Sequence, residues 1–373
     1  MTDNGQQQDA DSLRQTRFTT GGGWEAGTTL TDHPSSGSPA LAEIDGTIHL
    51  VYPAPLVEGE DVHHFPIVWT FSTPGAASAQ GGQWAIPEDT YIGLDSTTPP
   101  SLTLANHNGT LRLAHSQFYV YKDADAHPNG CSLAIHEAHL EAQDSPESYW
   151  SSAHSSLDRD YVFAPALAAF NGAAHLLYLH AGLDTLAHWV SDSRDTWRTV
   201  SAADGAKVIP PRTDADNKKA VAARGIARVH YPGSLGLAVH DGRLHALYRP
   251  SLRHGNFLHA SFDGSTWSEV APAIDAPYSL GHSDHNPALT SYDGQLHAVF
   301  PSDDDKLSHM TWTENGGWTK PVQLDDHKSR HTPALLTYKD GPAGAEQDVL
   351  LLVYRGTEGY QASTHDSVEP DAT

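Results

Sequence analysis

Residues 286–300 read NPALTSYDGQLHAVF, in which a short apolar run is followed by Asp-Gly and then by a run where apolar and other residues alternate. Asp-Gly between two such runs is a strong hairpin signal, because the tight turn needs positive φ at its central residues. The alternation is typical of a strand that buries one face. This stretch therefore predicts a β-hairpin.

Five further stretches repeat the pattern, the last of them with a longer turn. They are SPALAEIDGTIHLVY from Ser38, PPSLTLANHNGTLRLAH from Pro99, APALAAFNGAAHLLY from Ala164, SLGLAVHDGRLHALY from Ser234 and TPALLTYKDGPAGAEQDVLLLVY from Thr332. A third run follows each hairpin, and in five of the six copies it leads to a tryptophan that opens a fourth run. These closing tryptophans are Trp84, Trp150, Trp197, Trp267 and Trp318. Such internal self-similarity indicates a repeat architecture.

The sixth copy lacks its tryptophan, and the amino-terminal region supplies a matching piece. Residues 13–24, LRQTRFTTGGGW, match residues 307–318, LSHMTWTENGGW, in length and in the closing pattern, so Trp24 is the sixth tryptophan. Four strands in each of six units predict an all-β fold, a six-bladed β-propeller whose last blade joins both chain ends and leaves no open sheet face. We expect one domain over residues 11–366 between disordered tails at 1–10 and 367–373, with residues 217–230 as the one candidate helix.

Composition limits the partners. The formal net charge of −24 gives a surface that repels nucleic acid and anionic membranes, so we expect neither as a partner. The lone cysteine, Cys131, excludes a disulfide within the chain and favours a buried structural thiol. The sequence opens with no apolar signal region and contains no apolar run of about 18 residues. The default expectation is a cytoplasmic protein, with non-classical export as the alternative, and the oligomeric state is not readable.

Many of the 25 histidines recur at fixed positions. The second runs share His49, His175, His245 and His297, and the third runs share His188, His259 and His309. Recurrence in most blades favours a role in the scaffold. We expect these side chains to hydrogen-bond neighbouring backbone between blades.

Other residues gather on one face of the predicted propeller. The connections into the innermost strands, and those from second to third strands, open on the face opposite the Asp-Gly turns. We call this face the rim. It also carries His33 and His327 and the long insertions at 53–65, 121–130 and 203–229. Loops on one face of a rigid scaffold commonly bind ligands. The candidate ligand-binding residues are His230, His282, His285, His331, Arg249 and Arg355.

A divalent metal is an open alternative, with His230, His285 and His331 as candidate ligands, because imidazole suits Zn, Cu and Fe. His285 and His331 each stand two residues before a proline, whereas His230 aligns with His282, so the three are not equivalent. No compact metal motif such as HExxH is present. Residues 123–129, DADAHPN, alternate oxygen ligands in the manner of a calcium loop but lack the rest of that motif.

Residues 256–267, NFLHASFDGSTW, resemble the closing element of the fungal-type (Aleuria-like) fucose lectins, which are six-bladed propellers. The resemblance implies sugar binding between blades by an Arg, a Glu and an aromatic residue. Arg249 or Arg355 would supply the Arg, but His188, His259 and His309 occupy the place of the Glu. Residues 261–267, SFDGSTW, also resemble the sialidase Asp-box, a turn-stabilising element, with one residue fewer.

Two functions follow from these observations. The first is a carbohydrate- or glycoconjugate-binding, lectin-like propeller that uses the rim, and its ligand is a glycan or small molecule. The second is an enzyme with a His-rich site at the channel mouth that acts on a small anionic substrate, with a metal-dependent mechanism as one option. Unequal insertions favour one asymmetric pocket and hence the second function, whereas the absence of GxSxG, GxGxxG and P-loop motifs favours the first.

Overall fold

The computed structural model describes residues 12–55, 57–58, 63–64, 66–72, 84–85, 91–92, 101–119, 130–138, 150–155, 162–180, 185–192, 196–200, 234–249, 257–274, 286–302, 305–341 and 344–357. Every regular element within these residues is a strand. The candidate helix at 217–230 lies outside them. In the described part, no helix is long and apolar enough to cross a membrane.

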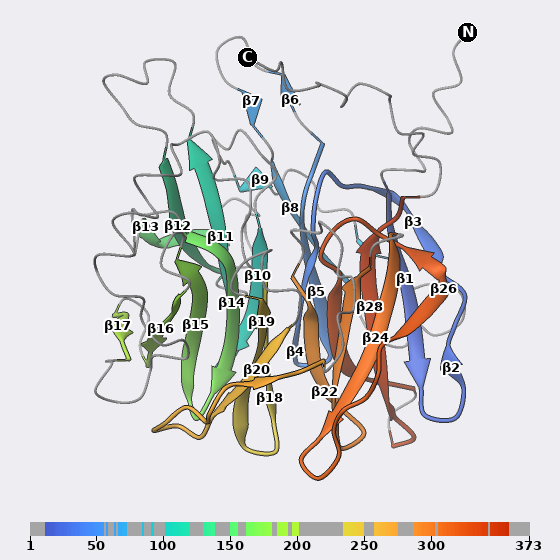
Figure 1. Cartoon of the computed structure of the whole chain (residues 1–373). Coiled ribbons are helices and arrows are strands. Elements are labelled where there is room, and N and C mark those ends of the chain that lie inside the picture. The colour runs from blue at the N-terminus through green and yellow to red at the C-terminus, as the bar shows by residue number, and fades with distance from the viewer. Residues whose placement is uncertain are drawn as a thin grey trace, which may run out of the picture.

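The strands form six blades of a β-propeller, which confirms the predicted fold (Figure 1). Blade 1 contains β4 (Ala40–Ile44), β5 (Thr47–Pro53), β8 (Ile67–Ser72) and β9 (Tyr91–Ile92). Blade 2 contains β10 (Leu102–His107), β11 (Thr110–Tyr119), β12 (Gly130–Ala138) and β13 (Trp150–Ser155). Blade 3 contains β14 (Val162–Phe170), β15 (Ala173–His180), β16 (Thr185–Ser191) and β17 (Arg198–Thr199). Blade 4 contains β18 (Ser234–His240), β19 (Arg243–Arg249), β20 (Leu258–Phe262) and β21 (Ala271–Pro272).

The last two blades each carry an additional outer strand. Blade 5 contains β22 (Ala288–Tyr292), β23 (Gln295–Pro301), β24 (Lys306–Thr313), β25 (Gly317–Trp318) and β26 (Val322–Lys328). Blade 6 contains β27 (Ala334–Asp340), β28 (Gln347–Arg355), β1 (Ser12–Thr19), β2 (Gly23–Trp24) and β3 (Thr28–Pro34). A separate short hairpin is formed by β6 (Val57–Glu58) and β7 (His63–His64).

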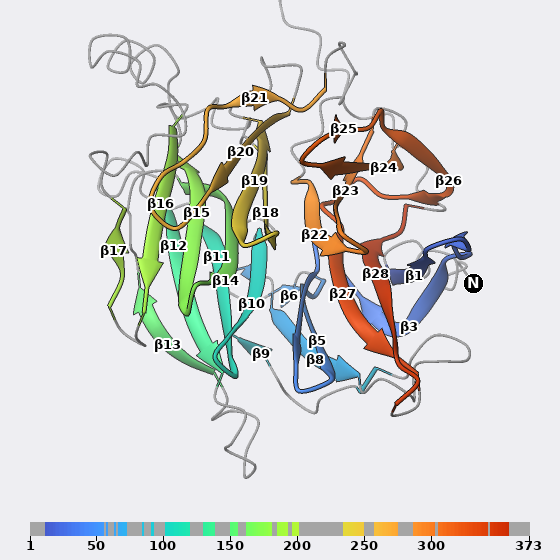
Figure 2. The same cartoon turned by 90° about the horizontal axis from the view of Figure 1, so that it is seen from below.

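The innermost strands form a closed ring around the axis. β4, β10, β14, β18, β22 and β27 each contact the next, and β27 contacts β4 again. The view in Figure 2 shows the blades arranged around this common centre. Hydrophobic side chains from adjacent blades pack together in shared clusters, so the core lies mainly between the sheets.

The hairpin turns have the backbone that the sequence predicts. The non-glycine residue of each short turn has φ between 45° and 53°, and the glycine after it also has positive φ. The residue pairs are Asp45-Gly46, Asn108-Gly109, Asn171-Gly172, Asp241-Gly242 and Asp293-Gly294. Two successive positive φ values define the type I′ turn, whose twist matches that of the flanking strands.

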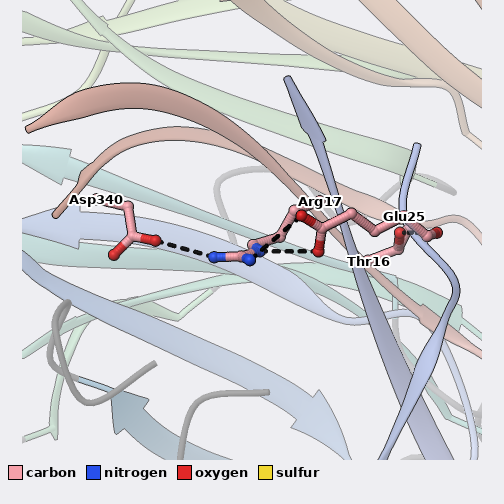
Figure 3. Close-up of polar contacts among 4 residues, drawn as sticks. All are labelled: Thr16, Arg17, Glu25 and Asp340. Atoms are coloured by element: carbon pink, nitrogen blue, oxygen red, sulfur yellow. Dashed lines mark hydrogen bonds and ion pairs between the residues drawn. The ribbon is translucent and has the colours of Figure 1, made fainter. Parts of the chain in front are cut away.

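Blade 6 joins the two chain ends, as predicted. β1 pairs antiparallel with β28, from Leu13↔Arg355 to Phe18↔Leu350, and Trp24 lies in β2. Arg17 of β1 connects the two parts of the blade, because its guanidinium bonds Asp340 at 2.9 Å and Glu25 at 3.1 and 3.2 Å (Figure 3). The amino-terminal segment is therefore fixed to β27 by charge as well as to β28 by strand pairing.

Candidate functional site

The histidines of blade 5 form a directed chain of hydrogen bonds. Trp24 of blade 6 places its indole Nε1 3.3 Å from Nδ1 of His309, and Nε2 of His309 lies 3.0 Å from Nδ1 of His297. An indole N–H can only donate, so Nδ1 of His309 accepts and the proton of that ring is on Nε2. His297 then accepts at Nδ1 and hydrogen-bonds the backbone of Tyr292 with its other nitrogen.

The full relay recurs in blade 3, and parts of it recur in blades 4 and 1. In blade 3, Trp267 lies 3.4 Å from Nδ1 of His188, which contacts His175 at 2.9 Å. In blade 4, His259 and His245 lie 3.0 Å apart, but Trp318 meets His259 through a ring contact of 5.4 Å and not through its indole N–H. In blade 1, a tryptophan replaces the third-strand histidine. This tryptophan is Trp69, and its indole donates to Nδ1 of His49 at 3.2 Å.

These histidines are neutral parts of the scaffold. Burial lowers the pKa to about 4 for the second-strand members, which are His49, His175, His245 and His297. Burial, followed by the nearby histidine of the same blade, lowers the pKa to about 3 for the third-strand members, which are His188, His259 and His309. The structural role is as predicted. The backbone partners expected between blades are wrong: the second-strand rings of blades 3, 4 and 5 bond backbone of their own blade, and the two rings of each pair bond one another. The bonds between blades come from the tryptophan of the following blade, which donates to His188 and to His309.

Blades 2 and 6 have other residues at the positions that histidines occupy in the remaining blades, which the sequence did not predict. Arg112 occupies the second-strand position in blade 2, pairs with Glu137 at 2.9 Å and lies 5.6 Å from the ring of Trp197. In blade 6 the third-strand position is Gln15, which accepts a bond from Trp84 at 3.0 Å. The sequence does mark the exception in blade 2. Its stretch NGTLR has an arginine three residues after the turn, where blades 1, 3, 4 and 5 have a histidine.

A further histidine pair lies on the opposite face of blade 2. Nε2 of His115 and Nε2 of His136 lie 3.0 Å apart, and the rings stack at 5.1 Å. Burial and the charge of His136 lower the pKa of His115 to about 3. This pair also is neutral and structural.

Two histidines assigned to the rim are buried. His33 bonds the hydroxyl of Tyr52 at 3.0 Å, and His327 bonds that of Tyr354 at 3.0 Å. Each contact joins an outer strand to the second strand of the following blade. The fold uses both side chains to hold blades together, so they are not available to a ligand.

Of the six candidate ligand-binding residues, His230, His282 and His285 lie outside the described residues. Arg249 ends β19 and Arg355 ends β28, at equivalent places after Tyr248 and Tyr354. Arg249 is buried, with 2% of its surface exposed, whereas Arg355 is half-buried. Equivalent sequence positions therefore give two different environments.

Arg355 and His331 lie together. Nη1 of Arg355 is 2.6 Å from Nε2 of His331 and donates to the carbonyl of Ser36 at 3.0 Å. A guanidinium only donates, so Nε2 of His331 accepts and this imidazole is neutral in the contact. Ser329 holds the backbone of His331 through two bonds of 3.0 Å, one to its carbonyl and one from its N–H.

An axial cavity of about 160 Å³ begins one residue further along the chain from His331. The cavity is lined by residues at or near the start of all six innermost strands, and by Pro39, Pro287 and Pro333, which directly precede three of them. His331 directly precedes Thr332, which lines the cavity and accepts a bond from the N–H of Asn286 at 2.7 Å. The cavity therefore lies toward the end of the axis opposite the hairpin turns, where β28 also ends.

Metal binding is not indicated within the described residues, which contain no group of three or more His, Cys, Asp or Glu placed to hold an ion. At His331, the cationic Arg355 faces Nε2. A metal ion there would have to displace the guanidinium or use Nδ1.

One Ser–His–Asp arrangement lies on the turn face. Nδ1 of His240 is 2.8 Å from Oγ of Ser291 in the next blade, and Nε2 is 3.4 Å from a carboxylate oxygen of Asp241. His107, at the equivalent place in blade 2, bonds the carbonyl of Gly172 in the next blade at 3.0 Å. The recurrence indicates a clasp between blades.

The Asp-box-like stretch is a turn, as the resemblance implies. Asp263 accepts the N–H groups of Thr266 and Ser265, both at 2.8 Å, and these bonds lower the pKa of its carboxyl. Phe262 and Trp267 form a bridge across the turn. This element fixes the closing tryptophan and carries no chemistry.

No family model and no curated protein matches the sequence. Among solved structures, AofleA from Arthrobotrys oligospora is 10% identical over 85% of this chain and 79% of its own, with a TM-score of 0.52. A Trypanosoma rangeli sialidase complex is 12% identical over 88% of this chain and 55% of its own, with a TM-score of 0.50. The fucose-specific lectin from Aleuria aurantia is 10% identical over 83% of this chain and 97% of its own, with a TM-score of 0.45. The first two matches support the propeller fold, and at these identities they show the fold alone.

Proposed function

We propose that the protein is a carbohydrate-binding, lectin-like propeller whose rim binds a glycan or glycoconjugate. One observation carries the proposal: Arg355 and His331 form a half-buried polar pair next to Thr332, which lines the axial cavity, whereas the strand histidines belong to the scaffold. Sugar hydroxyls need donors and acceptors placed together, which a guanidinium and an imidazole supply. The described fold, shared with proteins such as AofleA, provides a rigid support for such a site.

The site differs from the interblade sites of a multivalent lectin. Blade 4 has an arginine at the same place, but Arg249 is buried, so the blades do not offer equal sites. We therefore expect one principal ligand per chain at the cavity mouth. His230, His282 and His285 remain candidates for the same site.

A glycan array followed by calorimetry tests the proposal. Binding of a glycan with about one site per chain is the expected result. Arg355→Ala should weaken it by at least tenfold, whereas Lys320→Ala, which removes an exposed cation from an outer segment, should not change it. An array with no signal above background would remove the carbohydrate proposal.

The asymmetry between Arg249 and Arg355 also favours a second candidate, an enzyme with one site at the channel mouth. Arg355 would bind an anionic group of a small substrate, and a neutral imidazole such as that of His331 would act as the general base. Turnover of a panel of small anionic esters and lactones that is lost in both Arg355→Ala and His331→Ala would favour the enzyme. Binding without turnover would favour the lectin-like function.

A further inference from the structure

The amino-terminal segment, residues 12–34, completes blade 6 without a covalent link to the strand with which it pairs. It contains β1, β2 and β3, and β1 pairs with β28 from the other end of the chain. Blades 1 to 5 are each built from one stretch of chain in sequence order. The ring is therefore closed at blade 6 by hydrogen bonds and side-chain contacts alone.

We propose that residues 12–34 are an acid-sensitive latch, in which protonation of the histidines and carboxylates that hold the segment releases it and opens the ring before the other blades separate. The latch has two parts. One is the relay that receives Trp24, and the other is the ion-pair network of Arg17.

The relay holds Trp24 only while its two imidazoles are neutral. A proton added to His309 turns the accepting Nδ1 into a donor, which then faces the indole N–H of Trp24 at 3.3 Å. A proton added to His297 places two N–H groups against each other across the 3.0 Å contact with His309. Either event replaces a hydrogen bond by a donor–donor contact in a partly buried place.

The surroundings of the relay oppose that charge. Burial is the main cause of the lowered pKa values, about 4 for His297 and about 3 for His309, and the charges of His240 on His297 and of His297 on His309 act in the same direction. Asp293 favours the charged form of His297. The backbone of the neighbouring Tyr292 accepts a hydrogen bond from the His297 ring and acts in the same direction as Asp293. From blade 6, Phe18 packs on both imidazoles, and the ring of His327 lies 6.5 Å from that of Trp24.

The ion-pair network of Arg17, which is the second part of the latch, also weakens as the pH falls. Arg17 bonds Asp340 at 2.9 Å and Glu25 at 3.1 and 3.2 Å, as Figure 3 shows, and it also bonds Tyr338. Asp340 lies in β27, so this contact ties β1 across β28 to the innermost strand of the blade. Protonation of either carboxylate removes one ion pair from the segment.

Acid acts on the other relays as well, but with a different result. Protonation of the pair His175 and His188, or of His245 and His259, weakens contacts between blades whose strands remain in one stretch of chain. Among the described residues, the segment at 12–34 alone combines contact with a relay, an ion-pair network and a non-covalent junction. It is therefore the part that leaves first.

The candidate site depends on the same segment. Arg355 pairs with Leu13 of β1, and its guanidinium bonds Ser36, which lies two residues after the end of β3. Release of the segment would separate these groups and discharge a bound ligand. This consequence rests on the proposed function, whereas the latch itself does not.

Hydrogen–deuterium exchange of the full chain from pH 7.5 to pH 3.5, corrected for the intrinsic exchange rate at each pH, tests the latch without a ligand. We expect peptides covering 12–34 and 347–355 to lose protection at a higher pH than peptides from β10–β11 and β18–β19. Simultaneous loss of protection in all blades, or retained protection of 12–34, would overturn the proposal.

The chain itself supplies a matched variant. Blade 6 has Leu351 and Gln15 where blade 5 has His297 and His309, and Gln15 still accepts a tryptophan bond. The variant His297→Leu/His309→Gln copies this solution, so release of 12–34 should move at least one pH unit lower. The control His175→Leu/His188→Gln should leave the release pH unchanged. An unshifted release in the blade 5 variant contradicts the role of the relay, and the order of protection loss in the unmodified chain remains a test if that variant does not fold.

Discussion

Replacing His309 tests the directed relay most directly. His309→Ala removes the acceptor of Trp24 and the donor to His297, so two polar groups lose their partners at once. An unsatisfied buried polar group costs about 1–3 kcal/mol, so the two together should cost about 4 kcal/mol. At about 2 °C per kcal/mol for a large domain, the melting temperature measured by calorimetry should fall by about 8 °C.

His309→Gln is the matched control, because Gln15 holds the same place in blade 6 and bonds Trp84 at 3.0 Å. The amide oxygen accepts from Trp24 and the amide N–H₂ donates to His297, so the fall should be less than half that of His309→Ala. Trp24→Phe removes the indole donor and should cost less in the His309→Ala background than alone, a coupling that a double-mutant cycle measures. The reasoning fails if His309→Ala leaves the melting temperature unchanged or if His309→Gln lowers it equally.

Four further predictions follow from the described contacts. Arg112→Leu should destabilise by about 3–5 kcal/mol in chemical denaturation because it leaves Glu137 charged and buried, and adding Glu137→Leu should recover most of that loss. Arg17→Ala should lower the free energy of unfolding by about 1 kcal/mol, and the difference from wild type should shrink at 1 M salt, since its ion pairs are partly exposed. Between pH 7 and pH 5 the free energy of unfolding should fall by about 2 kcal/mol for each relay histidine, because the unfolded chain with histidine pKa near 6.5 binds more protons than the folded chain with pKa about 4; equal stability at the two pH values would contradict the neutral relays. His331→Gln should keep an acceptor for Arg355 and retain ligand affinity within threefold in calorimetry, whereas His331→Leu should reduce that affinity by at least tenfold.

The fold could be predicted because its signals are local and repeated. Asp-Gly or Asn-Gly between alternating runs defines each inner hairpin, and the length match between 13–24 and 307–318 locates the closure. The scaffold role of the recurring histidines also follows from their repetition. None of these inferences needs a contact between blades.

The partners of the histidines could not be predicted, because they depend on strand register. His297 lies opposite Thr311, and its bonding partner His309 is two residues away along β24, opposite Val299. Whether such residues meet is decided by the turn between second and third strands, whose length varies among blades. The burial of Arg112 could not be predicted either, because a charged residue in an alternating strand usually indicates a solvent-facing position.

The accessibility of side chains on the rim could be predicted even less well. Arg249 and Arg355 both follow a tyrosine at the end of a second strand, so the sequence treats them alike, yet one is buried and the other is half-buried beside His331. His33 and His327 precede innermost strands, as His331 does, but a tyrosine hydroxyl of the next blade takes each of them into the interior. Positions relative to a blade repeat therefore identify a face of the molecule but not which side chains remain accessible on it.

The comparison among blades separates what the fold requires from what this chain adds. Each closing tryptophan meets a side chain of the preceding blade, but that side chain is histidine in three blades, glutamine in blade 6, the ring of Trp69 in blade 1 and Arg112 in blade 2. The propeller thus needs a contact for the tryptophan and does not need an imidazole. Glutamine satisfies the indole N–H at every pH, whereas a buried histidine does so only while neutral, and its cost grows below a pH of about 6.5. The histidines of blades 3, 4 and 5 consequently give the ring a dependence on acid that its architecture alone would not have.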